Sequence, residues 1–116
     1  MKNVIQEKSF AFALRITKLC NHLQKRKHET IISRQLLRCG TSIGANVAES
    51  RYAQSRADFI SKLSIALKEA AETDYWLRLL HEASFLTDTE FQSIYTDCKE
   101  IEKLLSSIVK STKTNF

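Results

Sequence analysis

Apolar residues recur every three or four positions along four long stretches of the chain. This period places the apolar side chains of each stretch on one face of an α-helix. In residues 4–27 the apolar face comprises Ile5, Phe12, Ile16, Leu19 and Leu23. In residues 31–53 it comprises Ile32, Leu36, Ile43 and Val47. The pattern predicts one helix over each stretch.

Two further helices are predicted over residues 56–84 and 88–110, where the same spacing continues. Their apolar faces include Leu63 and Leu77 in the first and Ile94 and Leu105 in the second. The residues that follow position 110 are expected to fray, because chain ends seldom form enough contacts to stay ordered.

Polar residues with helix-capping chemistry precede these stretches. Thr87 and Glu90 form a T-x-x-E capping box, in which each side chain accepts a hydrogen bond from the other residue's backbone N–H. Ser55 and Asp58 form a similar pair, with Asp in place of the usual Glu. For the first two helices we expect the N-caps Asn3 and Thr30.

The connections between the four helices are only a few residues long, so consecutive helices are expected to run antiparallel. The chain contains no proline and only two glycines among 116 residues, whereas tight turns between strands need such residues. This composition excludes an all-β protein and disfavours glycine-rich phosphate loops. We therefore predict an all-α, up-down-up-down four-helix bundle that forms a single domain over residues 1–116.

Both glycines lie inside the second predicted helix. Gly40, Gly44 and Ala48 follow one another at intervals of four residues, and each glycine costs a helix roughly 1 kcal/mol relative to alanine. The spacing predicts a helix-packing groove, in which another helix approaches closely. A membrane dimerisation face is excluded because Arg38 and Glu49 flank the motif.

Some helices carry more apolar surface than one core face needs. Phe10 and Leu14 extend the first helix's stripe, and Leu104 and Val109 extend the fourth's. Such a helix either covers a wide core or packs against another subunit, and the periodicity leaves both interpretations open.

Charge is distributed unevenly along the chain. Its formal net charge is +5, but residues 1–56 hold eleven bases and three acids, whereas residues 57–116 hold seven bases and ten acids. The first half is therefore a candidate surface for polyanions. The candidate nucleic-acid-binding residues are Lys25, Arg26, Lys27, Arg34, Arg38, Arg51 and Arg56. The alternative is an ordinary solvated surface. Only Tyr52 adds an aromatic ring, so phosphate contacts are favoured over base stacking.

Residues that carry catalytic or metal chemistry do not form a motif. None of the three histidines stands in the Glu-x-x-His pattern of di-metal bundles. The cysteines, Cys20, Cys39 and Cys98, are odd in number and far apart, which excludes a disulfide framework or a zinc site and favours buried thiols. No run approaches the roughly 18 apolar residues of a membrane span. We expect a cytoplasmic, non-enzymatic protein with no cofactor, no metal and no membrane contact.

One polar cluster stands beside the apolar stripes of the second and third helices. It comprises Ser42, Asn46, Glu49, Glu69 and Glu72. Polar groups near a core need hydrogen-bond partners, so we favour a structural network that fixes helix register. A binding or catalytic pocket at Asn46, Glu49 and Glu69 is the alternative, and it requires these groups to open onto a cavity.

Residues 35–49, QLLRCGTSIGANVAE, resemble the signature of the 23S ribosomal RNA intervening-sequence protein family, also called the four-helix bundle protein family. Residues 58–60 (DFI), 65–72 (IALKEAAE) and 75–77 (YWL) are similar to its second signature, and residues 7–9 (EKS) to its opening. The resemblance implies a small bacterial protein that assembles as a homopentameric ring and has no catalytic activity.

The resemblance also implies partners. Some members are encoded within intervening sequences of large-subunit rRNA genes, and a related branch, the accessory variability proteins of diversity-generating retroelements, binds nucleic acid and a reverse transcriptase. Five copies of a +5 chain would carry about +25, which strengthens attraction to RNA or DNA. We therefore expect RNA or other nucleic-acid binding through the basic surface of the first two helices. The alternative is a protein-interaction adaptor without nucleic-acid contact.

Overall fold

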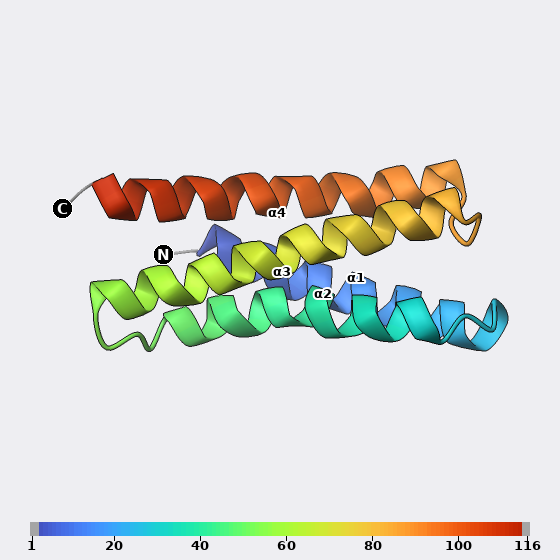
Figure 1. Cartoon of the computed structure of the whole chain (residues 1–116). Coiled ribbons are helices and arrows are strands. Elements are labelled where there is room, and N and C mark those ends of the chain that lie inside the picture. Colours follow the sequence, from blue (N-terminus) through green and yellow to red (C-terminus); the bar gives the residue numbers. More distant parts are fainter. Residues whose placement is uncertain (1–2, 115–116) are drawn as a thin grey trace.

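Four helices make up the computed structural model, which describes residues 3–114. They are α1 (Val4–Arg26), α2 (Ile31–Ser50), α3 (Arg56–Glu82) and α4 (Asp88–Thr114). The helices lie side by side along a long axis of 48 Å, and the chain turns back at each connection (Figure 1). The described residues form no strand, so the fold is all-α, as the hydrophobic pattern predicts.

The C-terminal ends of all four helices differ from the predicted ones, by one residue in α1, which ends at Arg26, and by two in α3, which ends at Glu82. Helix α2 ends at Ser50, three residues early, because the N–H groups of Arg51 and Ala53 bond carbonyls only three residues back and the chain leaves the α-helical path. Helix α4 continues beyond position 110 to Thr114. The Thr112 hydroxyl donates to the carbonyl of Ile108, which satisfies that group within the helix. Residues 115 and 116, also expected to fray, lie outside the described residues.

Three of the four predicted caps are confirmed. The Asn3 side chain accepts a hydrogen bond from the N–H of Gln6, and the Ser55 side chain accepts one from the N–H of Asp58. Thr87 and Glu90 exchange both capping-box bonds, at 2.8 and 3.2 Å.

The cap predicted at Thr30 is wrong, because its side chain makes no capping bond. The preceding residue, Glu29, replaces it: its buried carboxylate accepts the N–H groups of Ile31, Ile32 and Ser33 at 2.7–3.2 Å. A glutamate side chain is long enough to reach past position 30, and it places a negative charge at the positive end of the helix dipole.

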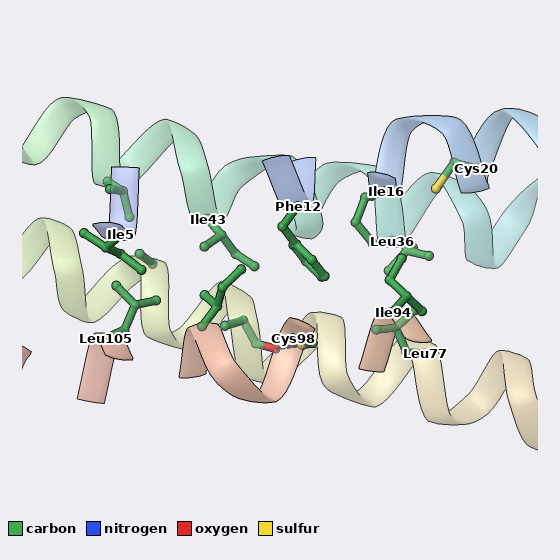
Figure 2. Packing of buried hydrophobic residues seen from close by; sticks show 14 of the residues in the cluster. Ile5, Phe12, Ile16, Cys20, Leu36, Ile43, Leu77, Ile94, Cys98 and Leu105 are labelled. Atoms are coloured by element: carbon green, nitrogen blue, oxygen red, sulfur yellow. Dashed lines mark hydrogen bonds between the residues drawn. The ribbon is translucent and has the colours of Figure 1, made fainter. Parts of the chain in front are cut away.

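The core lies along the axis between the four helices. Phe12, Ile43, Leu77 and Ile101, one from each helix, are at most 1% exposed. Figure 2 shows side chains from all four helices meeting in this layer, Phe12 and Cys98 among them. The extra apolar residues of α4 belong to the core, since Val109 is buried and Leu104 packs against it.

The extra apolar residues of α1 remain outside the core. Phe10 is 74% exposed and Leu14 is 50% exposed. Within one chain, the wide-core interpretation therefore fits α4 and does not fit α1.

Helices α1 and α2 approach closely at the two glycines. A Cβ atom on Gly40 would lie 2.8 Å from Cγ2 of Ile16, and one on Gly44 would lie 3.2 Å from the carbonyl oxygen of Ser9. Larger residues at these positions would push α1 away. Ala48, which we predicted to share this contact, is instead exposed, so the close contact involves the glycines alone.

Two connections contain residues with a left-handed backbone. His28, between α1 and α2, has φ 56°, and Ser84, between α3 and α4, has φ 68°. At the second connection the N–H of Phe85 bonds the carbonyl of Leu80, the six-to-one bond of a Schellman motif. Both connections lie at the same end of the bundle (Figure 1).

Candidate nucleic-acid interface

Four of the seven predicted bases gather at the α1–α2 connection. Lys25 and Arg26 occupy the last turn of α1, Lys27 caps it, and Arg34 lies in the first turn of α2. All four side chains are exposed, and none joins an ion pair within residues 3–114. Lys25, Arg26 and Lys27 suit this place because the C-terminal end of the α1 dipole is negative, whereas Arg34 lies at the positive end of the α2 dipole. We call these four residues the basic end.

The acidic groups around the basic end are largely engaged elsewhere. Glu29 is buried under the first turn of α2, and Asp88 lies 2.7 Å from His81. The pKa of Glu90 is lowered because the Thr87 N–H donates to its carboxylate, so that it stays ionised within the cap of α4. The carboxylates of Glu82, Asp88 and Glu90 are all exposed at this end, and those of Asp88 and Glu90 also take part in hydrogen bonds within the chain.

The other three predicted bases lie elsewhere, so the seven bases do not form one patch at one end of the bundle. Arg51 and Arg56 flank the α2–α3 connection at the opposite end, because the 20 residues of α2 span about 30 Å. Arg56 also interacts within the chain. Arg38 lies between the two ends, and its charge is neutralised by two glutamates of α3.

Inner bases of α1 are neutralised in the same way. The ammonium of Lys8 lies 2.8 Å from Glu100, and a guanidinium nitrogen of Arg15 lies 2.6 Å from Asp97. The hydrogen bond to Glu100 raises the pKa of Lys8. Because these acids come from α4, the pairing joins the two halves of the sequence and leaves the unpaired charge of α1 concentrated toward its C-terminal end.

Two residues of the predicted polar network, Glu69 and Glu72, pair with Arg38. The two guanidinium nitrogens of Arg38 lie 2.9 Å from Glu69 and 2.7 Å from Glu72, and the Trp76 indole N–H donates to Glu72 at 2.9 Å. The bonds from Trp76 and Arg38 lower the pKa of Glu72. Sequence reasoning placed Arg38 on a nucleic-acid surface and omitted Trp76, although the four-residue interval between Glu72 and Trp76 could have indicated their contact.

The remaining members of that network bond separately. Asn46 donates to the carbonyl of Ser42, and the Ser42 hydroxyl donates to the carbonyl of Arg38, all within α2. Glu49 pairs with Lys62 at 2.8 Å, toward the end of α2. The predicted residues therefore do not form one network, and Asn46, Glu49 and Glu69 do not converge on a common pocket.

A second polar cluster lies between α3 and α4, and sequence reasoning did not predict the partners of its central residue, Asp74. The carboxylate of Asp74, buried at 7% exposure, accepts hydrogen bonds from Arg78 at 2.9 Å, Tyr95 at 3.0 Å and Lys99 at 3.3 Å. Burial and the neighbouring Asp74 raise the pKa of Glu102 to about 7. Asp74 lies close to the apolar stripe of the third helix in the sequence. This position predicts that its carboxylate has hydrogen-bond partners, but it does not identify them.

The cysteines show no sign of activation. All three are free and buried, and burial raises the pKa of Cys20 to about 12 and that of Cys39 to about 11. Burial also raises the pKa of Cys98. These thiols stay protonated at neutral pH, so they are poor nucleophiles.

Neither a metal site nor a membrane span emerges from the described part of the chain. Residues 3–114 contain no group of three or more His, Cys, Asp or Glu side chains placed to hold a metal ion. None of their helices combines the length and the apolar character that a bilayer crossing requires.

Comparison with known proteins places the chain among relatives of the same fold. The family model described as 23S rRNA-intervening sequence protein matches residues 1–107. The chain is also similar to the crystal structure of a protein with unknown function from the S23 ribosomal protein family of Bacteroides thetaiotaomicron. The two share 54% sequence identity, with a TM-score of 0.92, over 93% of this chain and 96% of the other. A search of curated proteins found no match.

Proposed function

Because the chain belongs to the 23S rRNA-intervening sequence protein family, we propose that it is a non-enzymatic protein that binds RNA through the phosphates of its backbone. The contact surface in this proposal is the basic end. The protein acts as an antiparallel four-helix bundle assembled into a homopentameric ring, which repeats the basic end five times in the bacterial cytoplasm.

The proposal is supported chiefly by the observation that the bases of the basic end join no ion pair within residues 3–114. The inner bases Lys8, Arg15 and Arg38 each lie within 2.9 Å of a carboxylate, whereas the four bases of the basic end join no ion pair within residues 3–114. Of these four, Lys27 is near enough to Glu90 to contribute to the lowered pKa of that carboxyl. A base that is already paired gains little from a phosphate. An unpaired base releases condensed counterions when it neutralises one.

The surroundings of the basic end favour phosphate contact over base stacking. Tyr52, the aromatic residue we considered for stacking, is 81% exposed but lies at the opposite end of α2. Phosphate contacts position a protein on a nucleic acid but carry little sequence information. Binding is therefore expected to depend steeply on salt and weakly on RNA sequence.

The exposed apolar pair of α1 supports assembly. Phe10 and Leu14 lie one helical turn apart and are not covered by any other helix of the chain. A second copy that packs on them would bury this surface, and light scattering would then return a mass near five times 13.3 kDa. A mass near that of one chain at micromolar concentration would contradict the assembly.

Filter retention of a structured RNA at rising salt tests the binding. The variant K25Q/R26Q/K27Q should bind more weakly, and the slope of log K against log salt should fall by about one for each phosphate that the protein no longer neutralises. The matched control is K8Q/R15Q/K62Q, which removes the same net charge from bases that are already paired, and it should keep most of the slope.

Failure of the wild-type protein to bind RNA at low salt would contradict the proposed function. A pull-down partner that survives nuclease treatment would then favour the protein-interaction adaptor.

A further inference from the structure

Three acidic side chains in the middle of α4 contact neighbouring helices. Asp97 and Glu100 pair with bases of α1, and the carboxyl of Glu102 lies beside Asp74 of α3. The second half of the chain is therefore acidic by count, yet these three acids are engaged in contacts within the chain.

Three lysines of α4 have no acidic partner. Lys103, Lys110 and Lys113 are exposed, and none belongs to an ion pair within residues 3–114. Seven residues separate the first two, which is about two turns or 10 Å, and Lys113 follows less than one turn later. Their Cβ atoms therefore point to one side of α4. We call these three residues the α4 stripe.

The α4 stripe borders a groove between α3 and α4. Lys103 and Lys110 line it together with Ser106 and Ser107, and Leu67 of α3 contributes an apolar side chain. Lys99 and Glu102 complete the lining, and these two side chains pair with each other at 3.6 Å. Neither serine hydroxyl makes a hydrogen bond within residues 3–114, so both can donate to a ligand. Ammonium groups and free hydroxyls along one groove are the donors that proteins use to hold phosphate oxygens.

The helix dipole does not account for the positions of all three lysines. Cations are favoured by the helix dipole only within the last turn. Lys113 lies in that turn of α4, but Lys103 lies 11 residues before Thr114, about three turns away.

The α4 stripe lies far from the basic end. Helix α4 starts near the α1–α2 connection and runs toward the end where α1 begins (Figure 1). Lys110 is 22 residues beyond the first residue of α4, which corresponds to about 33 Å along the helix. One short phosphate segment cannot contact both surfaces of the same chain.

We propose that the α4 stripe is a second phosphate-binding surface, which holds a separate segment of RNA backbone from the one held at the basic end. The inference rests on the proposed function, because it takes RNA as the ligand. Each chain then contacts two segments about 30 Å apart, so the protein binds a folded RNA more tightly than a short single strand.

The salt dependence of RNA binding tests the second surface. The variant K103Q/K110Q/K113Q should lower the slope of log K against log salt by about two to three, and combination with K25Q/R26Q/K27Q should lower it further by a similar amount. The control K8Q/R15Q/K62Q has the same net charge as each triple variant. Circular dichroism melts check that every variant folds.

A footprint on the unmodified protein gives an independent measurement. Bound RNA should slow acetylation of Lys103 and Lys110 at least threefold, while Lys68, an exposed lysine of α3, should react at its free rate.

Each result has one meaning. An unchanged slope for the stripe variant, with a lower slope for the basic-end variant, overturns the second surface and leaves the proposed function intact. A control whose slope falls as far as that of the stripe variant also overturns it, because net charge alone would explain the change. Absence of wild-type binding overturns both proposals.

Discussion

The contacts between α1 and α2 and between α3 and α4 hold equivalent pairs of helices by different means. At the first, Gly40 and Gly44 let side-chain and backbone atoms of α1 come within van der Waals distance of α2. At the second, Asp74 is buried and accepts hydrogen bonds from three side chains. The first contact depends on shape, and the second depends on the satisfaction of a buried charge.

The two contacts should therefore respond to different perturbations. A close-packed contact without titratable groups responds to added volume and not to pH. A buried carboxylate cluster tolerates modest changes of volume, but it responds to the removal of a donor and to protonation. The following experiments test whether the two contacts separate in this way.

The largest effect is expected at Ile16, whose side chain faces Gly40. Ile16→Ala should lower the free energy of unfolding by about 3 kcal/mol, because it removes a fully buried side chain. Gly40→Ala should cost about 1 kcal/mol in the wild type, since the added Cβ would lie 2.8 Å from Ile16 Cγ2 and the helix-propensity gain offsets only part of the strain.

In the Ile16→Ala background, Gly40→Ala should be neutral or stabilising. Urea denaturation of the four proteins gives the coupling energy directly. An equal cost of Gly40→Ala in both backgrounds would show that the glycine is not needed for the close approach.

A smaller effect is expected from pH at the α3–α4 contact. The pKa of Glu102 is about 7 in the folded protein, above its usual value of 4.5, so the folded state holds a proton that the unfolded state has already released. Its contribution is complete below pH 4.5 and is lost as pH rises through 7. The shift corresponds to about 3 kcal/mol, which solvent screening at this partly exposed side chain reduces to about 2 kcal/mol.

Urea denaturation between about pH 5 and pH 8 measures this decrease. Glu102→Gln should flatten the profile, whereas Gly40→Ala, at the other contact, should keep the wild-type slope. A wild-type profile that is flat or rises over this range would contradict the raised pKa.

The smallest effect is expected from Tyr95→Phe, which removes one of the three donors to Asp74. The free energy of unfolding should fall by about 1 kcal/mol, because Arg78 and Lys99 still satisfy the carboxylate. Tyr75→Phe serves as the matched control: this ring is 50% exposed, and the change should cost less than about 0.5 kcal/mol. Equal decreases in a thermal melt would mean that the Tyr95 hydroxyl contributes nothing specific.

Much of the fold could be predicted from the sequence because its signals are local. The apolar period and the caps at Asn3, Ser55 and Thr87 depend on residues within a few positions of one another. The error at Thr30 shows the limit of this reasoning. The sequence pattern favours a short cap residue, but a glutamate one position earlier reaches the same N–H groups and leaves the threonine without a role.

The candidate site was harder to predict because its pairs are distant in sequence. Arg38 meets Glu69, 31 residues away, and Arg15 meets Asp97, 82 residues away. Which residues stand opposite one another depends on helix register and rotation, which periodicity does not fix. Charge counts by segment therefore assigned cationic character to Arg38 and missed the exposed lysines of α4.

The left-handed residues His28 and Ser84 lie where the fold should open locally most readily. A side chain in this conformation costs roughly 1–2 kcal/mol, and both of the chain's glycines, which would avoid that cost, are committed to the interior of α2. Both strained connections lie at the basic end. Backbone amides there should exchange with solvent hydrogen ahead of those in the middle of the bundle, and bound RNA should slow this local opening.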